Sequence, residues 1–360
     1  MQGRALRVYY YNNLWHYFGN IPFYLENLSS PYTAPQLSAD EVYNNLITEL
    51  ESVINSNVLP MRWDDVNCGR MSQAMCYMMY AEMVMYQKDT SRYATALKYM
   101  QEIIDDKNEY GIMDDFASIW KNSGEWCKES IWEVNYEIGF SERSWSNPQG
   151  IGGTVLPTLI SPNSWPGGEG WDAGANGWGF MPVRTETYNM FASNDKRRDA
   201  TVWDCRGVEY TKRYQDTGFW LGKYRPYTEN NATSGDKDLN YNNNLRVYRV
   251  AEAYLNAAEL LLETGGDATK AKDYVNIIRR RAGIAELGAV TVDDVINERH
   301  LEFVGEGKRY FDLVRTGKAA SVLVPDEYGY RTNSWTESKK YIPIAQAELD
   351  SDPALVQNNY

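Results

Sequence analysis

The chain has 360 residues, of which 43% are hydrophobic and 24% are charged, and this ordinary composition excludes disordered, fibrous and disulfide-scaffold classes. No stretch of the sequence approaches the ~18 consecutive apolar residues that a membrane-spanning helix requires. The net charge of −13 repels phosphate backbones, so we expect no nucleic acid partner.

The first part of the chain carries helical patterns. The segment 5–18 is apolar or aromatic on several sides, and Gly19 is placed to end a helix there. Ser38 and Glu41 form a capping box, and apolar residues at helical spacing follow it. The helices predicted in this part cover residues 5–18, 38–54, 71–86 and 93–104.

The middle of the chain, residues 106–244, has a different character. It is rich in Gly, Pro, Asn and Trp and shows no long helical period, although short alternating pieces such as 131–134 predict local strands. Irregular segments of this length are uncommon in compact domains and are usually functional. We therefore predict an irregular lobe that presents a ligand site.

Helical periodicity returns after this segment, and it contains an internal repeat. The pair of segments around Ala81 and Ala96 is repeated by the pair around Ala258 and Ala271, with only the turn differing in length. Small alanines that face alanine and tyrosine on the next helix are typical of tetratricopeptide-type helix pairs, which need stacked neighbours. The helices predicted here cover residues 245–263, 268–281, 292–304 and 309–315.

Together these patterns predict a mainly α fold. Helix pairs from residues 1–105 and 245–316 form a tetratricopeptide-like scaffold, and residues 106–244 are inserted as a loop-rich lobe with short β-strands. Residues 317–360 form a mostly irregular C-terminal tail that packs on the scaffold.

Four stretches, in order, resemble the signature segments of the SusD/RagB family of surface nutrient-binding lipoproteins from Bacteroidetes. An aromatic helix runs into YFGNIP, RVAEAYLNAAE opens the later helical region, and NERHLEFVGEGKRYFDLVR and YIPIAQAELD follow. The stretches lie within residues 6–22, 248–259, 297–315 and 341–360. The likeness extends over essentially the whole chain, and it implies the SusD-like fold predicted above.

The resemblance also implies a function. A family member captures oligosaccharides or polysaccharides at the cell surface, as an outer-membrane lipoprotein, and delivers them to a SusC-like TonB-dependent transporter. It implies neither catalysis nor a cofactor. Family members carry a lipoprotein signal, an acylated cysteine and further helical sequence upstream, so we expect the natural protein to extend beyond Met1.

The aromatic content points to a polar, flat ligand. The chain has 28 Tyr and 12 Trp but only 9 Phe, and indole faces stack on the C–H faces of sugar rings while amides and carboxylates bind the hydroxyls. Tryptophans of the middle segment alternate with such polar residues. The predicted glycan-binding residues are Trp145, Asn147, Asn163, Trp165, Trp171, Asp172 and Asn176.

Local context separates these tryptophans from those expected in the core. Trp165 and Trp171 bracket a Pro- and Gly-rich stretch that cannot pack densely, so we expect both indoles to be exposed. Trp145 lies in a similar Ser-, Asn- and Pro-containing segment. Tryptophans beside apolar, strand-like or helix-entry residues are assigned to packing. These are Trp132, Trp178, Trp203 and Trp220.

Other chemistries find less support. The four cysteines lack zinc-ligand spacing and are interpreted as small buried residues, with a Cys68–Cys76 bridge as the alternative. The charged residues between Glu298 and Asp312 are interpreted as interlocking adjacent helices, and no catalytic or metal-binding residue is predicted. Two other functions stay open: a glycoside hydrolase with an acidic, Trp-lined cleft, and a tetratricopeptide-type adaptor that binds peptides.

Overall fold

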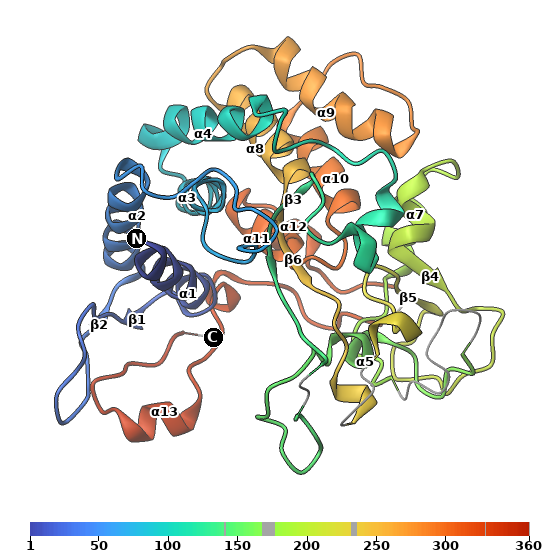
Figure 1. Ribbon diagram of the computed structural model, residues 1–360, viewed down its shortest axis with the longest axis horizontal. Helices are drawn as coiled ribbons and strands as arrows, with labels where there is room; N and C mark the ends of the chain where they lie inside the picture. Colours follow the sequence, from blue (N-terminus) through green and yellow to red (C-terminus); the bar gives the residue numbers. More distant parts are fainter. Residues whose placement is uncertain (140–141, 168–176, 232–235, 328, 360) are drawn as a thin grey trace. The chain divides into compact units, whose positions relative to one another are not determined.

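The computed structural model describes the chain except for residues 140–141, 168–176, 232–235, 328 and 360 (Figure 1). Its contacts divide the chain into two compact units. Unit 1 comprises Met1–Val66, Arg70–Met100 and Arg309–Tyr360, and unit 2 comprises Asn67–Gly69 and Gln101–Lys308. These two units do not test the predicted division into a scaffold (1–105 and 245–316), a lobe (106–244) and a tail (317–360). That division stays a prediction.

Unit 1 is built from helices whose starts are encoded locally. Ser38 caps the second helix through the predicted capping box with Glu41, and Ser72 caps the third by accepting a hydrogen bond from the Met75 amide. The first helix packs on the second and the second on the third. The elements are α1 (Gln2–Phe18), β1 (Ile21–Pro22), β2 (Gln36–Leu37), α2 (Ala39–Asn55), α3 (Gln73–Gln87), most of α4 (Tyr93–Asp105), α11 (Arg309–Arg315), α12 (Ala319–Val322) and α13 (Gln346–Ser351).

Unit 2 pairs helices α8 (Val250–Glu263) and α9 (Ala268–Ala282), which lie side by side in Figure 1. Ala258 and Ala271 are fully buried, as the repeat requires, and Tyr254 meets Tyr274 edge to face at 5.4 Å. The remaining helices and strands are β3 (Ser130–Val134), α5 (Leu156–Ile160), α6 (Thr185–Met190), α7 (Lys196–Thr201), β4 (Val202–Asp204), β5 (Phe219–Leu221), β6 (Leu245–Arg249) and α10 (Val292–Glu302). The predicted mainly α, helix-pair fold with short strands is confirmed.

One helix boundary differs from the prediction. Residues 245–249 form strand β6 instead of the first turn and a half of a helix, and β6 pairs antiparallel with β3. Its residues alternate partly exposed and buried positions, with Arg246 and Tyr248 turned inside. Alternation of every second residue is typical of a strand. In the sequence these five residues run directly into the helical pattern that starts at Val250, so the predicted helix includes them.

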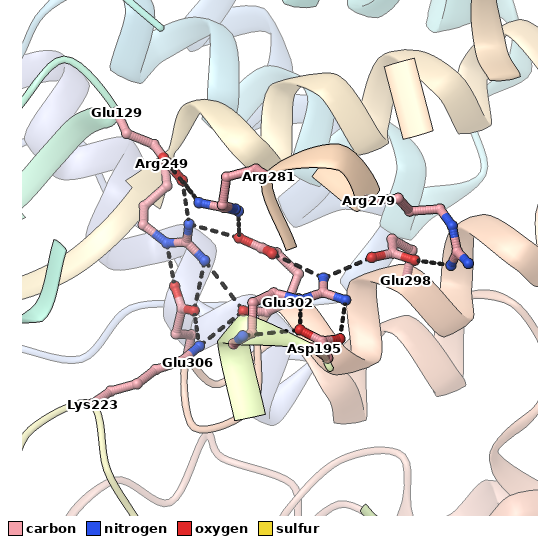
Figure 2. Close-up of polar contacts among 10 residues, drawn as sticks. Glu129, Asp195, Lys223, Arg249, Arg279, Arg281, Glu298, Glu302 and Glu306 are labelled. Carbon is pink, nitrogen blue, oxygen red and sulfur yellow. Dashed lines mark hydrogen bonds and ion pairs between the residues drawn. The ribbon is translucent and has the colours of Figure 1, made fainter. Parts of the chain in front are cut away.

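A buried network of charged residues joins the elements of unit 2 (Figure 2). Its carboxylates are Glu129, Asp195, Glu298, Glu302 and Glu306, and its cations are Arg197, Lys223, Arg249, Arg279 and Arg281. We call these residues the charge network. It connects α7, α9 and α10 with Lys223, which follows β5, and Arg249, which ends β6. The charged run from Glu298 to Glu306 therefore interlocks elements, as expected.

Glu302 is at the centre of the charge network. Its Oε1 accepts hydrogen bonds from Arg281 Nη2 at 2.6 Å and Arg249 Nη1 at 3.0 Å, and its Oε2 accepts from Arg197 Nη1 at 3.1 Å. Burial by itself raises the pKa of Glu302, but the three guanidinium groups outweigh burial and hold that pKa well below its usual range. Burial lowers the pKa of Lys223 to about 8, although its ion pair with Glu306 at 2.5 Å opposes the shift.

Three further observations concern the cysteines, the helix lengths and the residue types that could bind a metal. None of the four cysteines forms a disulfide, so the alternative Cys68–Cys76 bridge is absent. Within the described ranges, no helix is both long and apolar enough to cross a membrane. The same residues contain no group of His, Cys, Asp and Glu side chains arranged to hold a metal ion.

Candidate functional site: an exposed aromatic ledge

Three aromatic side chains of unit 2 form an exposed surface. The indoles of Trp145 and Trp178 lie 5.6 Å apart with their planes inclined by 31°, and Phe180 meets Trp178 at 5.8 Å. Trp145 is 56% exposed, Phe180 is 63% exposed and Trp178 is partly exposed. We call these three residues the aromatic ledge. Large exposed aromatic side chains that lie together mark a binding surface.

Trp145 occupies the tip of a tight turn. The backbone groups of Ser144 and Asn147 exchange hydrogen bonds of 3.2 and 3.0 Å, so Trp145 and Ser146 form the two-residue connection between them. The Trp145 amide donates to Asp236 Oδ2 at 2.7 Å, which fixes the turn from another part of the chain. The exposed indole is thus carried on an ordered backbone.

The base of this turn is tied to a buried asparagine. The Asn240 side-chain amide donates to the carbonyls of Arg143 at 2.9 Å and Asp236 at 2.8 Å, and its oxygen accepts from the Gly153 amide at 3.3 Å. Side chains at Gly152 and Gly153 would collide with Asn240 and with the Tyr241 backbone, which explains the glycine pair. Asn240 therefore holds both ends of the Trp145 loop.

The Trp178 segment is fixed by the end of a short helix. The amides of Trp178 and Phe180 donate to the carbonyls of Thr158 at 2.8 Å and Leu159 at 2.9 Å, both in α5. Carbonyl groups at the end of a helix have no partner within it, so the incoming segment satisfies them. The helix end and the ledge consequently stabilise each other.

Glycines on both sides of Trp178 allow this close approach. A Cβ at Gly177 would collide with the Ser161 carbonyl. Gly179 has φ +67°, and a Cβ there would lie 2.7 Å from Arg213 Cγ. The Arg213 side chain passes over Gly179 and donates to the Trp178 carbonyl from Nε at 3.0 Å and Nη2 at 2.6 Å.

The structure places the described members of the predicted site in different roles. Trp145 lies on the ledge, and Asn147 is exposed in the same turn with no hydrogen-bond partner for its side-chain amide among the described residues. Asn163 Nδ2 donates to the Gly177 carbonyl at 3.1 Å, so it holds the main chain next to Trp178. Trp171, Asp172 and Asn176 lie outside the described residues.

The expectation that Trp165 is exposed is wrong. Its indole is only 8% exposed and packs edge to face on Trp203 at 4.5 Å, in a cluster with Cys205 and Trp220. Ser164, at φ +56°, turns the chain just before Trp165, and the indole packs on Trp203 although a glycine-rich stretch follows it in the sequence. The buried positions of Trp132, Trp203 and Trp220 are as predicted.

The sequence patterns do not identify two of the ledge residues or the charged residues that hold the ledge. The helix entry after Trp178 predicts a core position, yet Trp178 is partly exposed. No pattern indicates Phe180, or Arg213 and Asp236, which bind the tryptophan main chains. The flanking glycines at 177 and 179 were a usable signal, because a large aromatic side chain between two glycines lacks covering neighbours in its own segment.

A groove in unit 1 is a second concave feature. It has a volume of about 1120 Å³ and runs along α1, with Tyr10, Leu14, Tyr24 and Tyr32 among its lining residues. The predicted helix 5–18 is therefore open on one side, since Tyr10 and Leu14 are exposed. The aromatic ledge matches a flat, hydroxylated ligand better because it offers neighbouring indoles and an exposed amide in the same turn.

The fold and the site together define a mainly α, helix-pair protein that carries exposed and partly exposed indoles on irregular loops. The family model for the SusD family matches residues 207–360. Surface glycan-binding protein A from Bacteroides uniformis is 61% identical, with a TM-score of 0.91, and the match covers all of this chain and 77% of that one.

Two further relatives agree. Surface glycan-binding protein A from Bacteroides thetaiotaomicron, solved in complex with laminarihexaose, is 53% identical with a TM-score of 0.93, over all of this chain and 78% of that one. SusD-like protein P25 from Formosa agariphila is 25% identical over 400 residues, which cover 99% of this chain and 70% of that protein. The chain belongs to the SusD family.

Proposed function

We propose that this protein binds glycans at the cell surface and that the aromatic ledge is the surface on which it binds them. The observation that carries the proposal is the Trp145–Trp178 pair, in which Trp145 is exposed and Trp178 partly exposed, because indole faces suit the C–H faces of pyranose rings. Asn147 supplies an exposed amide in the same turn as Trp145 for sugar hydroxyls. The similarity to a surface glycan-binding protein solved with a bound hexasaccharide supports the same conclusion.

The geometry favours a curved chain of sugars. Successive rings of a β-1,3-linked glucan are inclined to one another, whereas those of a β-1,4-linked glucan lie in a flat ribbon. The 31° inclination between the two indoles suits inclined rings. We therefore propose a β-1,3-glucan as the ligand class, with laminarihexaose, the ligand of the Bacteroides thetaiotaomicron protein, as the oligosaccharide to test.

The test is a titration of the protein with laminarihexaose, followed by tryptophan fluorescence and by calorimetry. A few stacking contacts of ~0.5–1.5 kcal/mol each, with the area they bury, give a dissociation constant of about millimolar to micromolar. Trp178→Ala weakens binding by about tenfold, since it removes one stacking face. Tyr32→Ala, which removes an aromatic side chain 72% exposed in unit 1, is the matched control and leaves binding unchanged. Equal binding by wild type and Trp178→Ala would contradict the proposal.

We further propose that binding occurs without hydrolysis. The carboxylate side chains of Glu298, Glu302 and Glu306 are at most 3% exposed and are paired with cations in the charge network, so they are not available to a sugar. Prolonged incubation with laminarin should release no new reducing ends. Any release that persists after repurification, and that a ledge variant abolishes, would indicate a glycoside hydrolase instead.

Membership of the SusD family supports a cellular role as well. We propose that the protein is an outer-membrane lipoprotein that passes captured oligosaccharides to a SusC-like TonB-dependent transporter. Weak binding suits such a transfer, because the ligand must leave the ledge again. Purification of the tagged protein from native outer membranes should co-isolate a transporter of this type. Recovery of the tagged protein in the cytoplasmic fraction alone would contradict the proposal.

A further inference from the structure

The two indoles of the aromatic ledge belong to loops that are far apart in the sequence, and each is held by one charged side chain. Arg213 donates two hydrogen bonds to the Trp178 carbonyl, at 3.0 Å from Nε and 2.6 Å from Nη2. Asp236 Oδ2 accepts from the Trp145 amide at 2.7 Å. In both cases the charged group binds the main chain of the tryptophan and leaves its indole uncovered.

Both charged residues are themselves anchored. The Arg213 amide donates to Asp216 Oδ2 at 3.2 Å, and the other carboxylate oxygen of Asp216 accepts from the Tyr210 hydroxyl at 2.7 Å. The Asp236 carbonyl accepts from the buried Asn240 side chain at 2.8 Å. Through these hydrogen bonds, the main chains of Trp145 and Trp178 are connected to other ordered segments of the chain.

We propose that Arg213 and Asp236 are positioning residues, which fix the mutual inclination of the Trp145 and Trp178 indoles before the ligand arrives. The inference rests on the proposed function of the ledge. Hydrogen bonds with one charged partner are stronger than neutral ones, and the planar guanidinium binds through two donors, which restricts the orientation of the Trp178 peptide group. A ledge ordered in advance avoids the entropy that binding would otherwise lose in ordering it.

The Arg213 test uses two substitutions in the full chain. Arg213→Met keeps the apolar stem over Gly179 but removes both donors, and Arg213→Lys retains one charged donor. Losing two hydrogen bonds of this kind should weaken laminarihexaose binding by about tenfold in Arg213→Met, and Arg213→Lys should recover part of the loss. Arg280→Met is the control and should bind like wild type. Arg280 is an exposed residue of α9 that pairs with Glu286.

The Asp236 test has the same form. Asp236→Ala removes the acceptor of the Trp145 amide, and Asp236→Asn retains an acceptor oxygen. Asp236→Ala should weaken binding several-fold, as expected for one charge-assisted hydrogen bond, while Asp236→Asn should bind within about twofold of wild type.

The near-ultraviolet circular dichroism of the unliganded protein is the readout that separates positioning from direct contact with sugar. It reports the relative orientation of neighbouring indoles, so Arg213→Met and Asp236→Ala should change it and their conservative variants should restore it. Wild-type spectra together with weakened binding would overturn the inference in favour of direct contact, and wild-type spectra with wild-type binding would overturn it outright. If wild type fails to bind laminarihexaose, the proposed ligand is wrong, and the spectra still decide the positioning role.

Discussion

Trp178 shows at the scale of one residue how the backbone decides what a side chain can do. Its neighbours Gly177 and Gly179 have no Cβ, so the main chain can pass close under Arg213 and over the carbonyl of Ser161. The Trp178 amide donates to the Thr158 carbonyl, and the Trp178 carbonyl accepts from Arg213. The indole is therefore left on the surface with an ordered backbone beneath it.

Gly179→Ala should weaken both binding and folding. The substitution places a Cβ at φ +67° and 2.7 Å from Arg213 Cγ, so it strains the backbone and displaces the side chain that holds the Trp178 carbonyl. The left-handed conformation alone costs an L-residue about 1–2 kcal/mol. Urea denaturation and a laminarihexaose titration measure the two effects. Gly207→Ala is the control, because a Cβ there meets nothing within 4 Å, and a Gly179→Ala protein as stable as that control would contradict the argument.

Alanine substitutions of Trp165 and Trp145 should have different effects, with the first lowering stability and the second weakening glycan binding. Trp165→Ala removes a buried indole that packs on Trp203, and we expect a loss of about 3–5 kcal/mol in the free energy of unfolding. Trp145→Ala removes an exposed indole and should weaken glycan binding with little change in stability. Urea denaturation of both variants checks the contrast. A Trp165→Ala protein that unfolds like wild type would mean that the indole is not part of the core.

At the scale of elements, the charge network joins strands and helices that the chain supplies from distant segments. Arg249 at the end of β6 pairs with Glu129 Oε1 at 2.6 Å, and Arg197 in α7 pairs with Glu298 of α10 at 2.6 Å. Ion pairs in a buried site are specific because each charge needs its partner. The network therefore connects α7, α10 and the end of β6 within unit 2.

Glu302→Gln should be strongly destabilising. The change removes one buried negative charge while Arg197, Arg249 and Arg281 keep theirs, and breaking one side of a buried ion pair costs about 3–5 kcal/mol. Equilibrium urea denaturation measures the loss. Glu286→Gln, in an exposed pair with Arg280, is the matched control and should change the free energy of unfolding by less than about 1 kcal/mol. Similar losses in the two variants would refute the central role of Glu302.

At the scale of the whole molecule, stability should fall in acid. The pKa values of Glu302 and Glu306 are lowered in the folded protein, since arginine and lysine partners outweigh the effect of burial. Each carboxylate therefore contributes stability that is present above the ordinary carboxyl pKa of 4.5 and is lost as the pH falls below it.

Urea denaturation at pH 7, 5, 4 and 3, followed by circular dichroism, checks this dependence. The midpoint should be nearly constant down to about pH 5 and should then decrease steeply as unfolded carboxylates take up protons. In Glu302→Gln, which lacks one of these groups, the decrease should be shallower. A midpoint that does not change between pH 5 and pH 3 would show that the buried carboxylates do not control acid stability.

The sequence was sufficient for the longer helices and for the family. The capping box at Ser38 and the apolar period after it are local, and so are the alanines at 81, 96, 258 and 271 that mark the helix pairs. Hydrogen bonds and packing between residues a few positions apart determine these features, so the pattern of neighbours along the chain is enough to find them.

The identity of the exposed indoles required the folded chain. Trp145 meets Asp236 and Trp178 meets Arg213 across separations of 91 and 35 residues, and no local pattern relates these positions. Trp165 and Trp178 have similar glycine-rich surroundings in the sequence, yet one is buried on Trp203 and the other lies on the ledge. Exposure of a large side chain depends on which distant segment covers it, and in irregular loops that is settled by long-range contacts.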